Sequence, residues 1–543
     1  MDSYKVSGQI VDVVAGSVYT GTIEITNGHI TTITEDPGVA GPLIIPGLID
    51  SHIHIESSML IPSEFARLAV VHGTTSVVAD PHEIANVLGM DGIRFMIQNG
   101  STVPFNFYFG APSCVPATPF ETAGAFLGPD EVEELLSWPE IKFLSEMMNF
   151  PGVLHGDPSV LAKIASAVKH GKPVDGHAPG LVGVEAVKYA EAGITTDHEC
   201  FTIDEAIGKI KAGMKILIRE GSAAKNFDDL MDLMVHYPKM IMFCSDDKHP
   251  DDLVKGHINL LIQRAIGAGH NFMDVIRACT LNPVRHYHLD SGLLQTGDKA
   301  DFILVDNAKD FHVLSTYVSG KLVADNGVSL IERVQAEPVN NFNPLMPRLD
   351  DLKVYAGSST HMNVIQAING QLITHKLTCK AKIVDGEVVS DMENDLLKMV
   401  VVNRYQHEKP SISFVKGFNL KEGAIASSVA HDSHNIIAIG TDDHSLLNVI
   451  SMIIKNRGGI CFYTQKHQGI LPLPVAGLMS MDDGYQVAEQ YQLINKAVHG
   501  MGAALESPYM TLSFMSLLVI PELKLSDKGL FDSRTFSYAN LLD

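Results

Sequence analysis

The chain lacks the cysteine pattern of a disulfide-stabilised or zinc-finger protein. Its 543 residues include only six cysteines, and no two of them form a CxxC pair. Scattered cysteines in so long a chain indicate reduced side chains in a cytoplasmic protein. The N-terminus has no basic flank before an apolar run, so we expect no secretory signal. The apolar run "FMSLLVIPEL" is shorter than the ~20 residues that cross a bilayer, so we expect no membrane partner.

Positive charge is also scarce. The chain has 40 Lys and Arg against 63 Asp and Glu, a formal net charge of −23. Phosphate-rich partners are bound by clustered basic side chains, so the balance argues against a nucleic-acid partner. No GxGxxG or GxxxxGK[ST] motif follows the first buried strand, which excludes the usual nucleotide-binding loops. Composition is otherwise that of a globular protein, with 45% hydrophobic and 19% charged residues.

The central part of the chain alternates strand-like and helix-like segments. Eight short apolar runs are mostly separated by segments long enough for a helix, such as "PSVLAKIASAVKHG". Eight such units over ~200–250 residues predict an α/β fold of the (β/α)8 TIM-like barrel type, and an open doubly wound sheet is the alternative. The runs are "LIDSHIH", "TTSVVADP", "FNFYFGAP", "IKFLSEM", "PVDGHAP", "ITTDHE", "KILIREG" and "IMFCSDD".

Flanking segments read as β structure. The first 46 residues alternate apolar and polar positions and contain an Asn27-Gly28 turn signal. Residues 291–340 return to short strands, so we expect them to join residues 1–46 in one small β-domain beside a barrel at 47–290. Residues 350–543 predict a C-terminal α+β domain, whose role the sequence leaves open.

The stretch "GLIDSHIHIESS" carries two histidines one residue apart, His52 and His54. Side chains at i and i+2 of a strand share a face. At the carboxyl end of a barrel strand, where TIM-barrel active sites lie, two imidazoles can bind one metal ion. Two buried histidines with ordinary hydrogen-bond partners are the alternative for an isolated HxH.

Further metal-ligand types stand at other strand ends. Glu146, His177 and His198 end the fourth, fifth and sixth runs, and Asp246 and Asp247 end the eighth. Four histidines and two carboxylates exceed one tetrahedral shell, so the set predicts two divalent metal ions. A bridging water would then become a hydroxide nucleophile near neutral pH, with Asp246 as general base and acid.

These motifs together resemble the adenine deaminases of the amidohydrolase superfamily. The similar segments include "PGLIDSHIHIESSM", "TTSVVADPHEIANVLG", "LSEMMNFPGVLHGD", "CSDDKHPDDL" and, near the C-terminus, "HDSHNIIAIGTDD" and "LPLPVAGLMS". The resemblance covers nearly the whole chain. It implies hydrolysis of the small molecule adenine to hypoxanthine and ammonia. It also implies two divalent ions, with Mn²⁺ ahead of Fe²⁺ and Zn²⁺ third, and a homo-oligomer.

The resemblance assigns the metal ligands by position. Glu146 takes the bridging place that a carboxylated lysine holds in some relatives, and Lys142, the nearest lysine, lies too far toward the barrel floor. Asp246 takes the place of the strand-eight aspartate, with Asp247 as the alternative. The implied ligands are His52, His54, Glu146, His177, His198 and Asp246.

Other polar residues are candidates for contact with substrate. His82 and Glu83 follow the second strand run, and we expect one of them to contact substrate or metal-bound water as a catalytic residue, the alternative being helix capping. Glu56 and Asp247 are weaker substrate-binding candidates.

The C-terminal histidines His431, His434 and His444 favour a structural role, although a loop that lends a residue to the barrel mouth is the alternative. Two other functions stay open from the residues alone. The same scaffold could hydrolyse another aminopurine or a cyclic amide, or it could be a non-catalytic relative, which the complete ligand set argues against.

Overall fold

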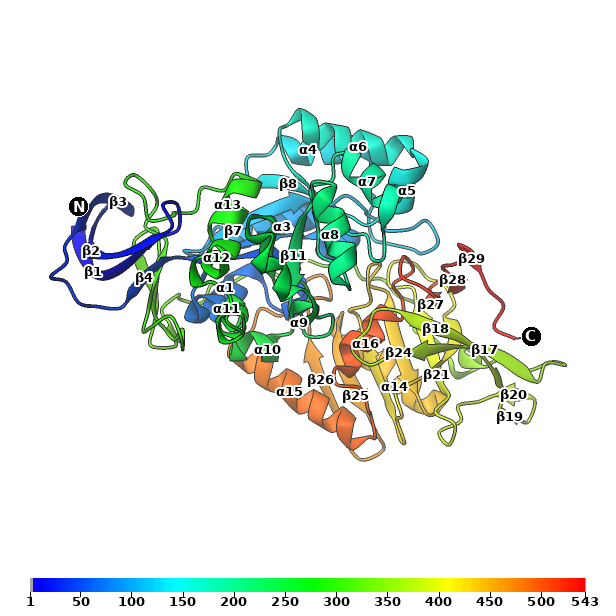
Figure 1. Cartoon of the computed structure of the whole chain (residues 1–543). Helices are drawn as coiled ribbons and strands as arrows, with labels where there is room; N and C mark the ends of the chain where they lie inside the picture. Colours follow the sequence, from blue (N-terminus) through cyan, green and yellow to red (C-terminus); the bar gives the residue numbers. More distant parts are fainter. Residues whose placement is uncertain (1–2, 543) are drawn as a thin grey trace.

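The computed structural model describes residues 3–542. Figure 1 shows three regions in a row, with the N-terminal strands at one end and a strand–helix region in the middle. A large C-terminal sheet with its helices lies at the other end. Within residues 3–542, no helix combines the length and hydropathy that spanning a membrane requires.

The middle region contains all eight predicted strands, in two parallel sheets of order β5-β6-β7-β8-β9 and β10-β11-β12. Backbone hydrogen bonds link the two sheets on both sides. The Asp246 N–H donates to the His52 carbonyl at 3.0 Å, and the Thr195 N–H donates to the Val174 carbonyl at 2.8 Å. The strands are β5 (Leu48–Ile53), β6 (Thr74–Ala79), β7 (Asn106–Ala111), β8 (Ile141–Met147), β9 (Val174–Gly176), β10 (Thr196–Asp197), β11 (Lys215–Arg219) and β12 (Ile241–Cys244).

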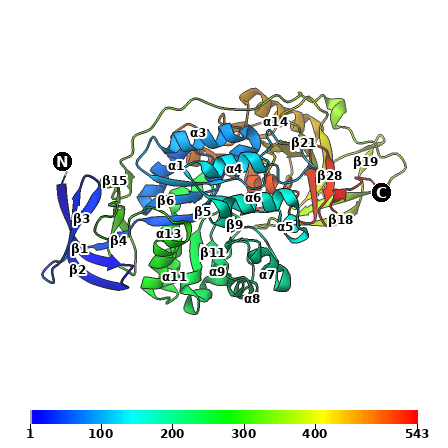
Figure 2. The same ribbon diagram turned by 90° about the horizontal axis from the view of Figure 1, so that it is seen from above.

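Helices lie on the outside of these strands, with α3, α4 and α6 on one side and α7, α8 and α11 on the other (Figure 2). Local sequence sets where they begin. The Asp157 carboxylate accepts from the Ser159 and Val160 N–H groups at the start of α6, and the Thr202 hydroxyl caps α8. The helices are α1 (Pro62–Ala69), α2 (His82–Leu88), α3 (Met90–Gly100), α4 (Pro129–Ser137), α5 (Phe150–His155), α6 (Pro158–Lys169), α7 (Gly183–Glu191), α8 (Ile203–Lys211), α9 (Phe227–Leu230), α10 (Pro250–Lys255), α11 (Ile258–Gly267), α12 (Phe272–Ala278) and α13 (Leu281–Tyr287).

The N-terminal strands and those that follow α13 share one sheet, of order β16-β15-β14-β13-β4-β1-β2-β3. The predicted turn joins β2 to β3, and both Asn27 (φ 52°) and Gly28 (φ 81°) adopt the positive φ of a tight hairpin. The strands are β1 (Ser3–Asp12), β2 (Ser17–Thr26), β3 (His29–Glu35), β4 (Leu43–Pro46), β13 (Phe302–Val305), β14 (Val313–Val318), β15 (Lys321–Asp325) and β16 (Val328–Ser329).

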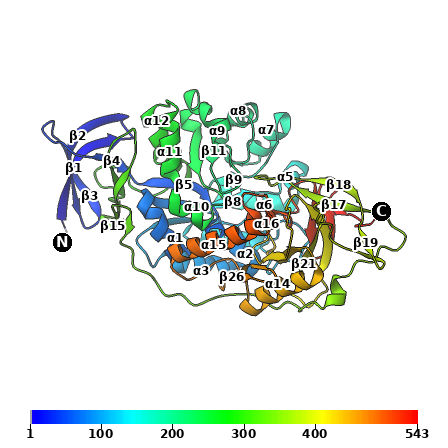
Figure 3. The same cartoon turned by 90° about the horizontal axis from the view of Figure 1, so that it is seen from below.

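The C-terminal region is built on an eight-stranded sheet of order β18-β17-β22-β21-β24-β23-β25-β26. Figure 3 shows α15 lying beside α1 and α10. There the Tyr491 hydroxyl meets Nδ1 of His249 at 2.5 Å. The strands are β17 (His361–Ala367), β18 (Thr374–Lys380), β21 (Leu397–Val402), β22 (Ser411–Lys416), β23 (Ala424–Ser427), β24 (Ile436–Gly440), β25 (Gly459–Tyr463) and β26 (Gln468–Pro472).

Smaller elements complete this region, which therefore mixes helices and strands as the sequence predicts. Helix α16 leads into a three-stranded sheet of order β27-β28-β29, and β19 pairs with β20. These elements are β19 (Ile383–Val384), β20 (Glu387–Val388), α14 (Asp443–Asn456), α15 (Gly484–Gly500), α16 (Pro508–Phe514), β27 (Leu523–Ser526), β28 (Gly529–Asp532) and β29 (Ser537–Tyr538).

Candidate metal centre

The structure brings the six predicted ligands together at the carboxyl ends of the parallel strands. All six side chains are buried, and their ring nitrogens and carboxylate oxygens form overlapping groups within 4.8 Å of one another. Each comes from the end of a different element except the first two, which leave β5 together. They are His52, His54, Glu146, His177, His198 and Asp246.

Glu146 is the central carboxylate. Its Oε2 lies 2.9 Å from Nδ1 of His177 and 3.1 Å from Nε2 of His198, and its Oε1 lies 3.5 Å from Nε2 of His54. Burial alone would raise the pKa of Glu146, but attraction to His177 and His198 holds that pKa well below its usual range. The carboxylate therefore faces imidazoles from both halves of the centre.

Asp246 lies opposite, with Oδ1 at 3.4 Å from Nε2 of His54 and 3.6 Å from Nε2 of His52. Its Oδ2 accepts from Nη1 of Arg219 at 2.5 Å. Burial opposes ionisation, yet the Arg219 guanidinium and the two imidazoles hold the pKa of Asp246 well below its usual range. Arg219 thus fixes one oxygen and leaves the other directed at the centre.

The donor set fits divalent metal ions. Both ring nitrogens of His52 are buried without a hydrogen-bond partner among the described residues, as is Nε2 of His177. Buried polar atoms are rarely left so, which indicates that a ligand completes the site. Nδ1 of His54 donates to the Asp80 carbonyl at 3.1 Å, so Nε2 is the nitrogen with a free lone pair. Imidazoles and carboxylates suit Mn²⁺, Fe²⁺ and Zn²⁺ alike.

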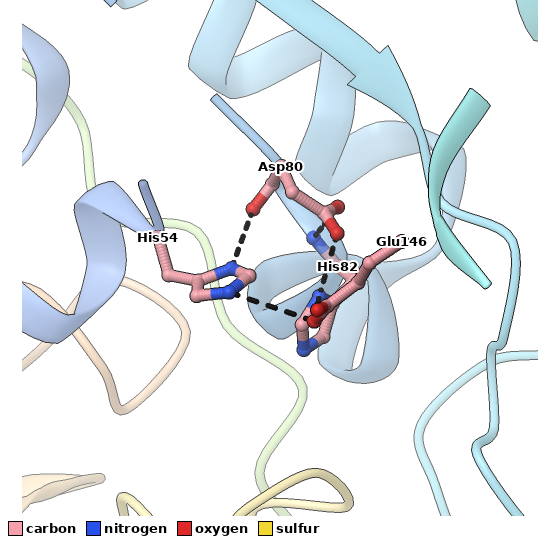
Figure 4. Close-up of side chains that lie close together, drawn as sticks. All are labelled: His54, Asp80, His82 and Glu146. Atoms are coloured by element: carbon pink, nitrogen blue, oxygen red, sulfur yellow. Dashed lines mark hydrogen bonds and ion pairs between the residues drawn. The ribbon is translucent and has the colours of Figure 1, made fainter. Parts of the chain in front are cut away.

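His82 lies at the edge of this centre, as the sequence predicts for the mouth of the second strand. Figure 4 shows His54 and His82 converging on the Glu146 carboxylate, with Asp80 contacting both. Nδ1 of His82 lies 3.0 Å from Oδ2 of Asp80 and 3.5 Å from Oε1 of Glu146. Burial lowers the pKa of His82, but Asp80 and Glu83 raise it well above its usual value.

Glu83 is held by histidines of the C-terminal region. Nδ1 of His431 and Nε2 of His434 contact its two carboxylate oxygens. Nδ1 of His434 accepts from the Ala430 N–H at 3.2 Å, so its proton lies on Nε2, and burial lowers the pKa of this histidine to about 4. Burial lowers the pKa of His431, but contact with Glu83 outweighs burial and raises that pKa to about 9.

The alternative that the sequence left open, a C-terminal loop that reaches the carboxyl ends of the strands, describes where two of the three C-terminal histidines lie. His431 and His434 contact Glu83 from a loop between β23 and β24, whereas His444 is exposed in α14. The sequence left the role of residues 350–543 open, and the structure shows that this region forms one wall of the centre.

The two weaker substrate candidates lie in different places. Asp247 faces the centre, and its Oδ1 accepts from the Ser57 hydroxyl at 2.5 Å. Glu56 lies outside the lining of the metal-centre cavity, and its Oε1 accepts from the Ile84 N–H at 3.1 Å at the start of α2. Burial raises the pKa of Glu56 to about 7. The structure thus shows Glu56 supporting a helix and not lining the cavity of the metal centre.

Glu199 and Arg219 are residues that the sequence analysis missed. Oε1 of Glu199 lies 3.5 Å from Nε2 of His198 and 3.7 Å from Nδ1 of His177, and Oε2 accepts from Nη2 of Arg219 at 2.9 Å. Arg219 ends the seventh strand, and this position at a strand end was the feature of the sequence that could have indicated a role at the site. Glu199 directly follows His198, which hid it from an argument based on alternation.

The centre opens into a cavity of about 30 Å³ that residues of the middle and C-terminal regions enclose together. That volume holds about two water molecules, so a larger ligand requires its walls to move. Glu199, Leu372 and Val519 also line a neighbouring cavity of about 450 Å³. The C-terminal lining of the smaller cavity is Leu372, His431, Asp432, Phe514, Leu517 and Val519.

The middle and C-terminal regions each match a known protein family. Residues 43–323 match the Amidohydrolase family, and residues 371–537 match the Adenine deaminase C-terminal domain. The chain is 51% identical over 535 residues to an adenine deaminase of Sulfurovum sp. (strain NBC37-1), covering 98% of this chain and 99% of that one. It is 51% identical over 542 residues to that of Salinibacter ruber, with 99% of each chain covered.

Matches to solved structures are more distant. A beta-aspartyl dipeptidase of Fervidobacterium islandicum AW-1 is 17% identical with a TM-score of 0.47, covering 62% of this chain and all of that one.

Proposed function

The chain belongs to the adenine deaminases of the amidohydrolase family, and we propose that its buried centre holds two divalent ions for this reaction. The reaction hydrolyses adenine to hypoxanthine and ammonia. Water supplies the oxygen at C6, and the exocyclic amino group leaves. The observation that carries the assignment to this centre is the convergence of four histidines and two carboxylates, with both nitrogens of His52 lacking hydrogen-bond partners within residues 3–542.

Six residues would hold the ions. Glu146 contacts imidazoles from both halves of the centre and is our choice for the shared ligand. Divalent ions in such a site lower the pKa of water to about 7 and so supply a nucleophile at neutral pH. We propose Mn²⁺ as the first choice, Fe²⁺ as the second and Zn²⁺ as the third. The other ligands are His52, His54, His177, His198 and Asp246.

Asp246 would carry the proton. Its Oδ1 faces the centre while Arg219 holds Oδ2, so the accepting oxygen has a fixed position. Asp246 takes a proton from water as the C6–O bond forms. It returns that proton to the amino group as the C6–N bond breaks, which makes ammonia the leaving group.

His82 would position the adenine ring. It lies between Asp80 and Glu83, which favour its protonated form, and it lies 3.5 Å from Glu146. A protonated imidazole at this place donates to a ring nitrogen of adenine and draws electrons from C6. Glu83 acts through His82, because both its oxygens contact C-terminal histidines.

We also infer one closed (β/α)8 barrel over residues 47–290. The hydrogen bonds that join β12 to β5 and β9 to β10 support closure. The shared sheet supports a small β-domain made of residues 1–46 and 291–340. Residues 350–543 would then be a third domain that closes the site.

We propose further that the enzyme is a cytoplasmic homo-oligomer. An exposed apolar patch supports self-association, because α7 and α8 pack together and present apolar side chains at their N-terminal ends. Val184 is 84% exposed. The other members of this α7/α8 patch are Val182, Val187, Phe201 and Ile203.

The test is adenine turnover by protein loaded with Mn²⁺, followed by absorbance, beside metal analysis. Asp246→Asn should lower kcat by at least ~10³-fold, and Asp385→Asn, in an exposed turn, is the matched control. Two ions per chain without adenine turnover would refute the substrate. Turnover unaffected by Asp246→Asn would refute the proton carrier.

A further inference from the structure

The C-terminal domain places one carboxylate at the cavity that receives no hydrogen bond from the part of the chain that the structure describes. Asp432 is 3% exposed and lines the cavity beside His82. Its Oδ2 has no partner among the described residues. Its Oδ1 lies 3.9 Å from Nε2 of His82 and 4.0 Å from Nδ1 of His431, which is beyond hydrogen-bond distance.

Every other carboxylate of the cavity has a donor. Glu83 contacts two histidines, and Glu146 contacts His177. Asp247 accepts from Ser57, and Glu199 and Asp246 share Arg219. A buried carboxylate without a donor is costly, so native proteins rarely keep one without a reason. Asp432 is therefore the acceptor that a ligand is left to satisfy.

We propose that Asp432 accepts the ring N–H of adenine and thereby selects the free base over bases substituted at N9. The proposal rests on the function proposed above and deepens it. It assigns a specificity residue to the C-terminal domain, more than 180 residues beyond the last proposed metal ligand, Asp246. The partner is defined by its chemistry, a planar base whose one ring N–H is free.

The position of Asp432 fits that end of the substrate. Nδ1 of His82 lies 3.5 Å from Oε1 of Glu146, and Oδ1 of Asp432 lies 3.9 Å from Nε2, the other ring nitrogen of His82. In adenine the imidazole-ring N–H is at the far end of the base from C6. Once the walls of the cavity of about 30 Å³ move apart to admit a base with C6 at the metal centre, its N–H would extend toward Asp432.

The neighbouring side chains suit a flat ring. Leu372, Phe514, Leu517 and Val519 line the same cavity and are apolar, so they can cover the faces of a base while Asp432 meets its edge. A sugar or methyl group at N9 removes the N–H whose hydrogen bond Asp432 would accept. It would leave that carboxylate buried beside carbon, which is the arrangement that rejects analogues most strongly.

The experiment compares adenine with 9-methyladenine in the wild type, Asp432→Asn and Asp432→Ala, all loaded with Mn²⁺. We expect the wild type to prefer adenine by at least ~10⁴-fold in kcat/KM. Asp432→Ala should lower kcat/KM for adenine by ~10²–10³-fold and shrink the preference to ~10²-fold or less. Asp432→Asn keeps the shape and one acceptor, so it should lower kcat/KM for adenine by ~10–100-fold, mainly through KM.

The control is Asp385→Asn, with metal content measured for every variant. Wild-type values for adenine in both Asp432 variants would overturn the proposal, as would equal losses for both substrates. Loss of metal from Asp432→Asn would overturn it too, because Asp432 would then be a ligand. The proposed function fails separately, if the metal-loaded wild type leaves adenine unchanged.

Discussion

Lys209→Met should strongly destabilise the middle strand–helix region, although Lys209 touches no proposed substrate position. Lys209 is fully buried, and its Nζ donates to Oδ2 of Asp197 at 3.1 Å, to Oε1 of Glu205 at 2.8 Å and to the Ala178 carbonyl at 2.7 Å. These partners adjoin two proposed metal ligands, since Asp197 precedes His198. The Asp197 carboxylate also accepts from the Ala178 and Glu199 N–H groups.

The expected loss of unfolding free energy follows from removing the Lys209 ammonium group. Two buried carboxylates would lose their cation, and removing one partner of a buried ion pair costs about 3–5 kcal/mol. For a barrel of this size each kcal/mol lowers the melting temperature by about 2–4 °C, so we expect a fall of about 6–20 °C. The ligand-bearing segments should also shift, so affinity for Mn²⁺ should fall.

The assay is thermal unfolding of metal-free protein, because bound metal would add its own stabilisation. Lys169→Met is the matched control, since Lys169 forms an ion pair with Glu133 while 70% exposed. Exposed pairs contribute at most about 1 kcal/mol, so this variant should melt within about 4 °C of the wild type. Equal melting temperatures for the two variants would refute the reasoning about Lys209.

Three further predictions follow from single contacts. His434→Gln should lower kcat/KM for adenine by ~10–100-fold with metal content unchanged, because it weakens a charge-assisted hydrogen bond to Glu83; metal loss would contradict this. Val184→Glu should shift the protein to a smaller species in size-exclusion chromatography if the α7/α8 patch is the subunit contact, and an unchanged mass would exclude that patch. Burial lowers the pKa of Lys524 to about 7, against ~10.4 when unfolded, so the unfolded chain binds the extra proton between these values. The free energy of unfolding of the wild type, relative to that of Lys524→Met, should therefore rise by up to about 2.7 kcal/mol from pH 7 to 9. The same pH dependence of unfolding in both proteins would contradict this.

The sequence predicted the strands of the middle region and the residues at their ends. Alternation along a strand placed His52 and His54 on one face, and the structure confirms that their imidazoles lie together. Buried parallel strands have strong apolar signals, so the eight runs stood out. The N-terminal strands and β13–β16 lie in one sheet, while the small β-domain that we expect from them stays a prediction.

Alternation failed where a strand ended sooner than its pattern. Glu56 shares parity with His52 and His54, but β5 ends at Ile53 and the chain turns into a short 3-10 helix at Ile55–Ser58. The side chain therefore points to α2. Glu199 was missed for a related reason, because β10 has only two residues and sets no lasting alternation.

Contacts between domains could not be read from the chain. His431 and Asp432 lie in a loop of the C-terminal sheet, and nothing local shows that this loop faces His82. Arg219 is not a metal-ligand type, so its role at Asp246 became visible only from the geometry.

We propose that this buried centre holds two ions and deaminates adenine. Titration of the metal-free protein with Mn²⁺, with adenine turnover followed at each step, tests this most directly. We expect activity to rise to a plateau at about two ions per chain, and Glu146→Gln to abolish the plateau. Full activity at one ion per chain, or activity independent of Glu146, would contradict it.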